Sequence, residues 1–163
     1  MIRSIYFSGA DELQLDIPID QYSQALQNTQ GILWVDFVGE DPEHCEDILL
    51  KTFGFHPLAV DDALRETHVP KVDDWDDYLY IVLQDIHFHS GEGDIDALEL
   101  DVFISRNYIV THHDLPISTL DRVWENCQRD LRHFRNGADR ILYRITDELT
   151  ANYMGIIESL DEE

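Results

Sequence analysis

The stretch that most constrains the fold runs from residue 53 to residue 88 and reads FGFHPLAVDDALRETHVPKVDDWDDYLYIVLQDIHF. Gly54 predicts the end of a preceding helix, because glycine readily adopts the left-handed conformation that closes helices. Pro57 predicts the first turn of a new short helix, where a missing N–H is tolerated. Pro70 ends that helix, an acidic loop with Asp73, Asp74, Asp76 and Asp77 follows, and the apolar run at 78–88 predicts a strand. This order of elements indicates helices packed as layers on a sheet.

Acidic residues are concentrated on the outer face of this short helix. Asp61 lies four residues before Arg65, a spacing that forms a favourable ion pair on a helix. Asp62 and Glu66 have the same spacing and repel each other by roughly a few tenths of a kcal/mol. Local helix stability therefore gives no reason for Asp62. A solvated surface is the ordinary explanation for such acids, and a binding site is the alternative.

The runs GFHPLAVDDAL and HVPKVDDWDDYLYIVL resemble the cytoplasmic N-terminal domain of CorA-type magnesium transporters. The likeness is carried by Gly54, His56, Pro57, Asp62, Pro70, Lys71, Val72 and Tyr78, followed by the strand at 81–83. The resemblance extends along the whole chain but covers only the regulatory half of the family, because the sequence holds neither the two C-terminal membrane spans nor their Gly-Met-Asn signature. Val69 stands where the family usually has a basic residue, which leaves the preferred cation open between Mg²⁺ and Zn²⁺, Co²⁺ or Ni²⁺.

Length and charge limit the classes of partner. The 163 residues suit one domain, and a hydrophobic content of 44% supports a packed core. Eleven basic and 34 acidic side chains give a net charge of −23, which repels nucleic acid and anionic membrane surfaces and attracts cations. Cys45 and Cys127 lie far apart without a C-x-x-C motif, so we expect two reduced thiols in a cytosolic protein.

Several motifs that would indicate other functions are missing from the sequence. The N-terminus has no apolar signal region, and no apolar run approaches the roughly 20 residues of a membrane helix, so we expect a soluble chain. Neither G-x-x-x-x-G-K-[ST] nor G-x-G-x-x-G occurs, and the turn at 90–93 is too short for a phosphate loop. H-E-x-x-H is also missing, and we expect no enzymatic activity.

The remaining segments predict an α/β fold. Runs of β-branched and aromatic residues predict strands at 4–8, 13–17, 32–38, 98–105 and 108–112, besides 78–88. Start signals at Asp20, at Asp41-Pro42 and at Pro116 or Ser118 predict helices at 20–27, 41–53 and 116–134. Trp34 is expected to anchor the sheet to a covering helix. We predict one layered α/β/α domain, residues 1–163, with a central mixed sheet of parallel and antiparallel strands.

A long helix is predicted from Ala138 to the end of the sequence. Its apolar residues recur at spacings of three and four, at Leu142, Ile145, Leu149, Tyr153, Ile156 and Leu160. The pattern still runs at Leu160 without a helix-ending signal, so we expect that further helix follows in the parent protein. The resemblance implies that this helix leads toward a stalk and the membrane spans.

The resemblance also implies a set of metal-binding residues. By position in the family, Asp62 lies at the interface between subunits and faces an acid from a neighbour's stalk helix. Asp61 helps to hold a second ion, and the run RILYRITDELTANY places Asp147 opposite Asp61. Mg²⁺ suits this chemistry, because it binds one or two carboxylates and keeps several of its waters. We expect weak Mg²⁺ binding by the isolated domain, since the stalk acid lies outside this sequence.

Histidines offer a rival metal site. His87 and His89 alternate along a predicted strand and therefore share one face, a spacing that zinc sites use. His112 and His113 are adjacent and point to opposite faces, which makes them weaker candidates. Surface imidazoles at a strand end are the simpler explanation. A metal-dependent hydrolase built from these residues lacks a recognisable ligand set.

We predict a cytoplasmic regulatory domain of a CorA-like divalent metal ion transporter that senses intracellular Mg²⁺ and gates transport. The resemblance implies a homopentamer at the cytoplasmic face of the inner membrane, although the isolated domain is expected to be a monomer. The membrane would be reached only through the missing C-terminal spans. Two alternatives stay open: a zinc-transporting relative and a free-standing acidic interaction module.

Overall fold

The computed structural model describes the chain except for residues 66, 68, 90–93 and 162–163. Its centre is a seven-stranded sheet in the order β2-β1-β3-β7-β6-β5-β4. The strands are β1 (Ile2–Phe7), β2 (Leu13–Leu15), β3 (Ile32–Val38), β4 (Lys71–Asp74), β5 (Leu79–His89), β6 (Asp94–Ile104) and β7 (Tyr108–His113). The pair β3–β7 is parallel and the other pairs are antiparallel, which confirms the predicted mixed sheet.

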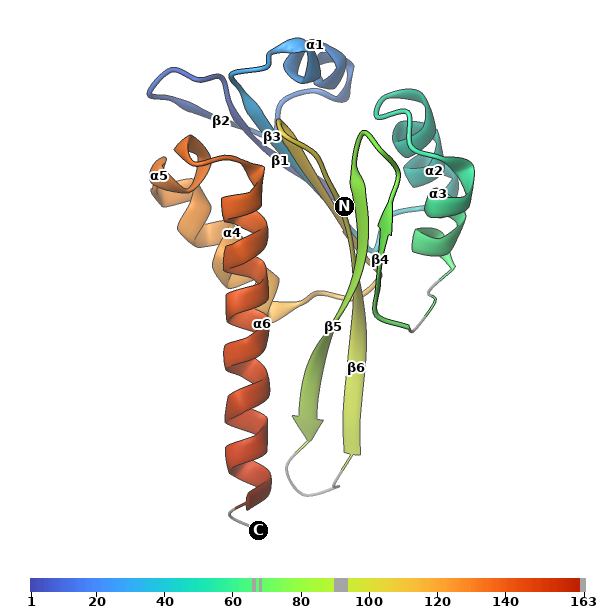
Figure 1. Cartoon of the computed structure of the whole chain (residues 1–163), viewed down its shortest axis with the longest axis vertical. Coiled ribbons are helices and arrows are strands. Elements are labelled where there is room, and N and C mark those ends of the chain that lie inside the picture. Colours follow the sequence, from blue (N-terminus) through green and yellow to red (C-terminus); the bar gives the residue numbers. More distant parts are fainter. Residues whose placement is uncertain (66, 68, 90–93, 162–163) are drawn as a thin grey trace.

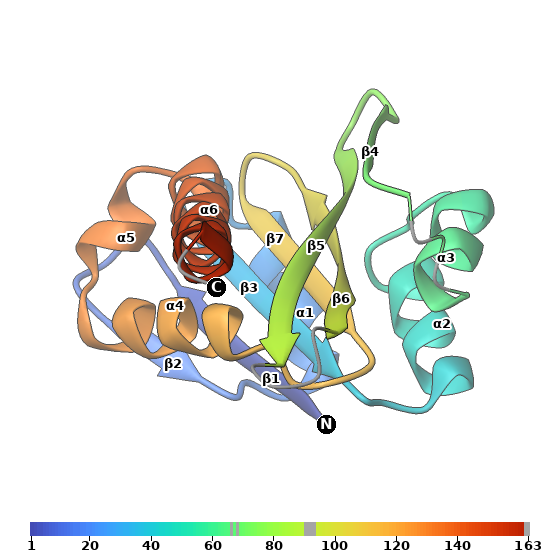
Figure 2. The same ribbon diagram turned by 90° about the horizontal axis from the view of Figure 1, so that it is seen from below.

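Helices cover both faces of the sheet, so the predicted α/β/α layering is confirmed (Figures 1 and 2). One face carries the 3₁₀ turn η1 (Ile19–Gln21) and the helices α1 (Tyr22–Gln27), α2 (Pro42–Lys51) and α3 (Pro57–Leu64). The other face carries α4 (Ser118–Arg129), α5 (Arg132–Arg135) and α6 (Ala138–Asp161). Among the described residues, none of these helices combines the length and the apolar character that crossing a membrane requires.

The start signals of α2 and α3 act as the sequence predicts. The Asp41 side chain accepts hydrogen bonds from the backbone N–H groups of Glu43 and His44 and so caps α2. The His56 ring caps α3 by accepting from the N–H of Leu58, and Pro57 follows at the first helical position. Gly54 has a φ of 71°, as the close of the preceding helix requires.

Several elements differ from the sequence prediction. The acidic segment after Pro70 is not a loop, because Lys71–Asp74 pairs with β5 as an edge strand. Strand β6 begins at Asp94 rather than at 98, since its full length pairs with β5. The helix predicted at 116–134 is divided, because Asp130 adopts an extended conformation between α4 and α5. Asp20 lies inside η1 and caps no helix through its side chain.

Each face of the sheet has its own hydrophobic core. On the α4–α6 face, the fully buried ring of Trp34 meets Trp124 edge-on with centroids 4.6 Å apart, which confirms the predicted anchor between sheet and helix. On the α1–α3 face, the Phe55 ring stacks on Phe103 with centroids 4.3 Å apart. These aromatic contacts fix helices on both sides of the central strands.

Helix α6 is buried along a stripe shifted from the predicted one. Ile141, Ile145 and Leu149 are buried at spacings of four, whereas Leu142 is only partly buried. The side chain of Leu160 lies outside the described residues. Beyond Leu149 the helix contacts β5 through polar groups instead, because Asn152 donates hydrogen bonds to strand residues. Of the predicted stripe, Ile145 and Leu149 are therefore buried, while Leu142, Tyr153 and Ile156 are partly buried and Tyr153 also donates a hydrogen bond to β5.

Candidate functional site

The candidate metal residue Asp62 lies in the last turn of α3 and forms an ion pair with Lys71 on the edge strand β4. Its Oδ2 atom accepts a hydrogen bond from Nζ of Lys71 at 2.5 Å. The same ammonium group lies 2.9 Å from Oδ2 of Asp73. Asp62 therefore has a structural partner that local helix stability did not indicate, because this partner comes from the strand that follows. The pair of Asp62 with Glu66 lies outside the described residues.

The three side chains of this cluster are accessible to solvent. Lys71 is 28% exposed, and Asp62 and Asp73 are 39% exposed each. Hydrogen bonds to Asp62 and then to Asp73 raise the pKa of the Lys71 ammonium group, which stays charged near neutral pH. Two carboxylates and one ammonium group leave the cluster with a net charge of about −1.

A buried polar pair lies beneath Lys71. The ammonium group lies 5.2 Å from the centroid of the Tyr80 ring, within the range of a cation–π contact. The Tyr80 hydroxyl donates to Oδ1 of Asp101 at 2.6 Å, and Nδ1 of His112 lies 3.6 Å from Oδ2 of the same carboxylate. Burial raises the pKa of Asp101 to about 6, although the nearby His112 ring and the hydrogen bond from Tyr80 act in the opposite direction. The sequence did not predict this pair, since nothing in the pattern of β6 separates a buried aspartate from an exposed one.

Asp61 faces solvent on α3 and lies beside Arg65. Its Oδ1 atom lies 2.8 Å from Nε of Arg65, and its side chain is 49% exposed. The predicted pairing of these residues is confirmed. An exposed pair of this kind stabilises the helix by only about 0.3–0.5 kcal/mol, so Asp61 can exchange Arg65 for another cation at little cost.

Asp147 lies on α6, across the sheet from α3 (Figure 2). Its carboxylate lies 3.7 Å from Nη1 of Arg144, one turn earlier on the same helix. The structure therefore brings Asp61 and Asp62 together on α3 but does not bring Asp147 to them within one chain. A site that combines all three would have to form between two copies of the chain.

The donor chemistry of the α3–β4 cluster fits a hard divalent cation. Its oxygen atoms belong to carboxylates, and their partial exposure leaves room for the waters that Mg²⁺ retains. Within the described part of the chain, no group of three or more His, Cys, Asp or Glu side chains is arranged to hold a metal ion. The cluster thus supplies part of a coordination shell, which solvent or a second chain can complete.

The side chains of three candidate histidines lie in the described part of the chain, His87 partly exposed and His112 and His113 buried. Nε2 of His87 lies 3.3 Å from Oδ2 of Asp85, whose side chain is fully buried. The side chain of His89 lies outside the described residues, so the predicted zinc pair stays a prediction. His112 and His113 point to opposite faces as expected, toward Asp101 and toward Asp36. Both are buried, although no feature of the sequence indicated that they leave the surface.

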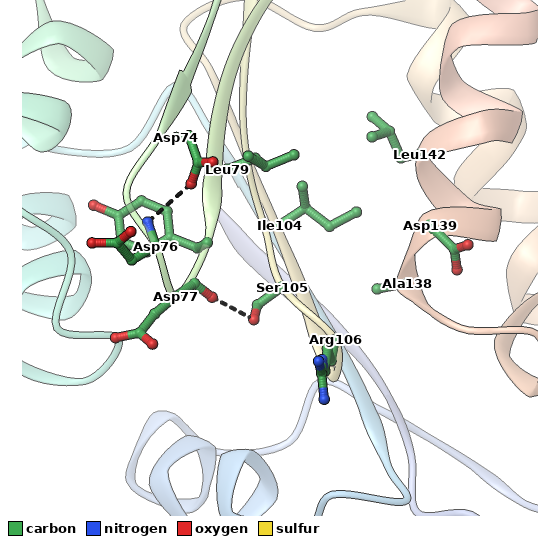
Figure 3. A pocket seen from close by; sticks show the side chains of 11 residues that line it. Asp74, Asp76, Asp77, Leu79, Ile104, Ser105, Arg106, Ala138, Asp139 and Leu142 are labelled. Atoms are coloured by element: carbon green, nitrogen blue, oxygen red, sulfur yellow. Dashed lines mark hydrogen bonds between the residues drawn. The ribbon is translucent and has the colours of Figure 1, made fainter.

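A second acidic feature is a groove of about 830 Å³ between the β4–β5 turn, the β6–β7 turn and the start of α6 (Figure 3). Acidic side chains line its rim, and its apolar lining comes from the sheet and from α6. The acidic residues are Asp74, Asp76, Asp77 and Asp139, and the large apolar ones are Leu79, Ile104 and Leu142. Asp74 and Ser105 are occupied in fixing the turns, since they bond to the N–H of Asp76 and to the carbonyl of Asp77. The groove does not include Asp62.

The chain is similar in sequence to known cation transporters. The family described as CorA-like Mg²⁺ transporter protein matches residues 29–163. The protein YfjQ of Bacillus subtilis is 28% identical over 163 residues, which are 99% of this chain and 48% of that protein. The cobalt/magnesium transport protein CorA of Thermotoga maritima is 25% identical over 134 residues, or 80% of this chain and 37% of that protein. The chain therefore spans about half the length, or less, of these relatives.

A solved structure supports the same fold. The soluble domain of CorA from Methanocaldococcus jannaschii superposes with a TM-score of 0.73, covering 99% of this chain and 60% of that one, at 21% identity. The mixed sheet with its long C-terminal helix is thus the fold of that soluble domain.

Proposed function

Because the chain belongs to the family of CorA-like Mg²⁺ transporter proteins, we propose that it is the cytoplasmic regulatory domain of a divalent-cation transporter and that Mg²⁺ binding at Asp62 is its signal. The observation that carries the proposal is the solvent-accessible carboxylate of Asp62 at the end of α3. The carboxylate of Asp73 on β4 binds the same lysine, Lys71, beside it. Asp61 adds a third acid on the same helix.

The proposed mechanism is electrostatic. In a homopentamer, Mg²⁺ bound between Asp62 of one copy and an acid of its neighbour holds the two copies together at high internal Mg²⁺. A second ion bridges Asp61 and Asp147, which one chain alone keeps on opposite faces of the sheet. When Mg²⁺ falls, the acids of neighbouring copies repel each other, the assembly loosens and the pore opens. The net charge of −23 supplies the repulsion.

The full-length protein would lie at the cytoplasmic face of the inner membrane. This chain covers the part that resembles the soluble domain of CorA, so transport itself belongs to segments beyond it. We propose no catalytic role for the domain. Its task is to convert ion occupancy at the interface between copies into a change in their packing.

The deciding experiment compares MgCl₂ with NaCl at matched ionic strength by thermal unfolding. With a weak site, ten times the dissociation constant of Mg²⁺ adds about 1.4 kcal/mol of stability, a shift of a few degrees. Asp62→Asn should remove part of this excess, and in a longer chain that assembles through the stalk Asp61→Asn with Asp147→Asn should remove most of the rest. Asp20→Asn, an exposed acid on the distant turn η1, is the control and should leave it unchanged.

The proposal fails if Mg²⁺ stabilises the protein no more than NaCl does, in this chain and in a longer one that includes the stalk. A micromolar Zn²⁺ site that is lost in His87→Ala would instead favour the zinc-transporting alternative. If Asp62→Asn and Asp20→Asn lose the Mg²⁺ effect equally, Mg²⁺ stabilises the protein only by screening the acidic surface in general.

A further inference from the structure

The cation already held at the candidate site is the ammonium group of Lys71. It lies 2.5 Å from Asp62 and 2.9 Å from Asp73, so both carboxylates converge on one positive charge. A divalent ion that approaches Asp62 from solvent therefore meets a carboxylate that is already paired. Binding requires either that the ion shares Asp62 with Lys71, at the cost of repulsion between cations, or that it displaces the ammonium group.

We propose, resting on the proposed function above, that Lys71 is a tethered competitor of the divalent ion at Asp62. The ion takes Asp62, and the ammonium group withdraws to Asp73. The competition weakens ion binding, so that the site is empty at low Mg²⁺ and fills only when the ion is abundant. Lys71 is then a positioning residue that sets the threshold of the sensor without binding the ion.

The surroundings of Lys71 make this exchange inexpensive. Asp73 stays within reach on the same strand, so the displaced ammonium group keeps a partner. The Tyr80 ring, whose centroid lies 5.2 Å from Nζ, offers a second favourable contact for the charge. Because the Lys71 side chain is 28% exposed, water can hydrate the ammonium group as it moves.

The exchange also changes how α3 is attached to the sheet. Asp62 lies on α3 and Lys71 opens β4, so their ion pair joins the helix to the edge strand. When a mobile ion replaces the ammonium group at Asp62, the ion pair between α3 and β4 is broken. Ion occupancy is thereby linked to the position of α3, the helix that carries both candidate acids.

The expected size follows from Coulomb's law. Without Lys71, the local charge on Asp62 and Asp73 is −2 instead of −1. One unit charge about 6 Å from a divalent ion in water changes its binding constant about tenfold. Lys71→Met keeps an unbranched apolar side chain and removes the charge, so it should lower the dissociation constant for Mg²⁺ about tenfold.

The chain offers a matched control, because it contains two lysines. Lys51 pairs with Asp47 on the exposed surface of α2, and Lys51→Met changes the net charge by the same amount. Calorimetric titration with MgCl₂ at constant ionic strength should show tighter binding in Lys71→Met and little change in Lys51→Met. Equal tightening in both variants, or unchanged or weaker binding in Lys71→Met, would overturn the proposal.

A second measurement uses the unaltered protein and does not depend on the folding of a variant. Acylation of lysines by an amine-reactive ester, followed by mass spectrometry, should become faster at Lys71 as MgCl₂ is added, with no change at Lys51. If the acylation rate of Lys71 stays constant while Mg²⁺ saturates an Asp62-dependent site, the ammonium group is not displaced. That result would refute the role of Lys71 and leave the proposed Mg²⁺ site standing. If Mg²⁺ shows no Asp62-dependent binding in either the unaltered protein or Lys71→Met, the proposed function fails as well.

Discussion

Nε2 of His113 lies 3.2 Å from Oδ1 of Asp36, and this buried pair joins the end of β7 to the centre of β3. The other ring nitrogen, Nδ1, lies 2.7 Å from the carbonyl oxygen of Leu115. Both neighbours are acceptors, so the ring is best satisfied as the doubly protonated imidazolium. On the far side of the carboxylate, Nε of Arg3 lies 2.8 Å from Oδ2 of Asp36, and the Arg3 guanidinium stacks over Trp124.

The pair predicts a specific dependence of stability on pH. Burial lowers the pKa of His113, but hydrogen bonding and attraction to Asp36 outweigh it and the pKa is raised. Burial raises the pKa of Asp36, and His113 together with Arg3 reverses this effect, so the pKa is lowered. The histidine contribution is complete below about pH 6.5 and is lost as pH rises through the raised pKa of His113. The aspartate contribution is lost only in acid, as pH falls through the lowered pKa of Asp36.

His113→Gln should therefore cost about 3 kcal/mol near pH 5.5 and progressively less at alkaline pH. Urea unfolding at several pH values measures the difference from the unaltered protein. His44→Gln, on an exposed face of α2, is the control and should stay within about 0.5 kcal/mol. A cost of His113→Gln that is constant from pH 5.5 to 9 would contradict a charged His113.

Asp101 predicts a pH dependence opposite to that of Asp36 and of the same sign as that of His113. Burial raises its pKa to about 6, so the ionised form is disfavoured in the folded state. The contribution of this group to stability falls as pH rises from about 4 to about 6, by an amount on the order of 3 kcal/mol. Asp101→Asn keeps an acceptor for the Tyr80 hydroxyl and stays neutral. The free energy of unfolding of Asp101→Asn, measured with urea relative to the unaltered protein, should rise between about pH 4 and pH 6. A difference that does not change with pH would refute the raised pKa of Asp101.

The attachment of α6 depends on Asn152. Its Nδ2 group donates to Oδ1 of the buried Asp85 and to the carbonyl oxygen of Ile86, both at 2.8 Å. Thr119 of α4 donates to the other oxygen of Asp85. Asn152→Ala leaves buried acceptors unpaired, and we expect a loss of about 1–3 kcal/mol with faster amide hydrogen exchange in the second half of α6.

Asn126→Ala, at an exposed position on α4, is the matched control for this change. Equal exchange rates in α6 for the two variants would mean that apolar packing alone holds the helix.

The contact of Trp34 with Trp124 predicts a large packing effect. Trp124→Ala removes the ring that meets Trp34 at 4.6 Å and lies under Arg3, and should cost about 3–5 kcal/mol. Trp124→Phe keeps an aromatic edge at the same place and should cost only about 1–2 kcal/mol. Thermal unfolding of the two variants separates these values. Similar losses in both would show that the indole ring itself, and not aromatic packing, is what the core needs.

Local signals in the amino-acid sequence determined much of the fold. Strand β3 begins and ends at the predicted residues, and the caps of α2 and α3 act where Asp41, Pro42 and Pro57 indicated. These features depend on backbone preferences within a few residues, which the sequence records directly. The likeness of residues 53–88 to the CorA family likewise led to the correct fold, because it spans a helix, a turn and a strand with fixed spacing.

Only the tertiary structure decided the partners of the acidic residues. Asp62 meets Lys71 because β4 pairs with β5. The sequence did not predict this edge strand, because the charged segment Lys71–Asp74 lacks the apolar alternation that is typical of strands. Asp36 and Asp101 are buried because partners from other strands neutralise or hydrogen-bond them. The burial energy of a carboxylate depends on groups that lie far away in the sequence. An aspartate at the surface and one in the core therefore look the same until the strands are assembled.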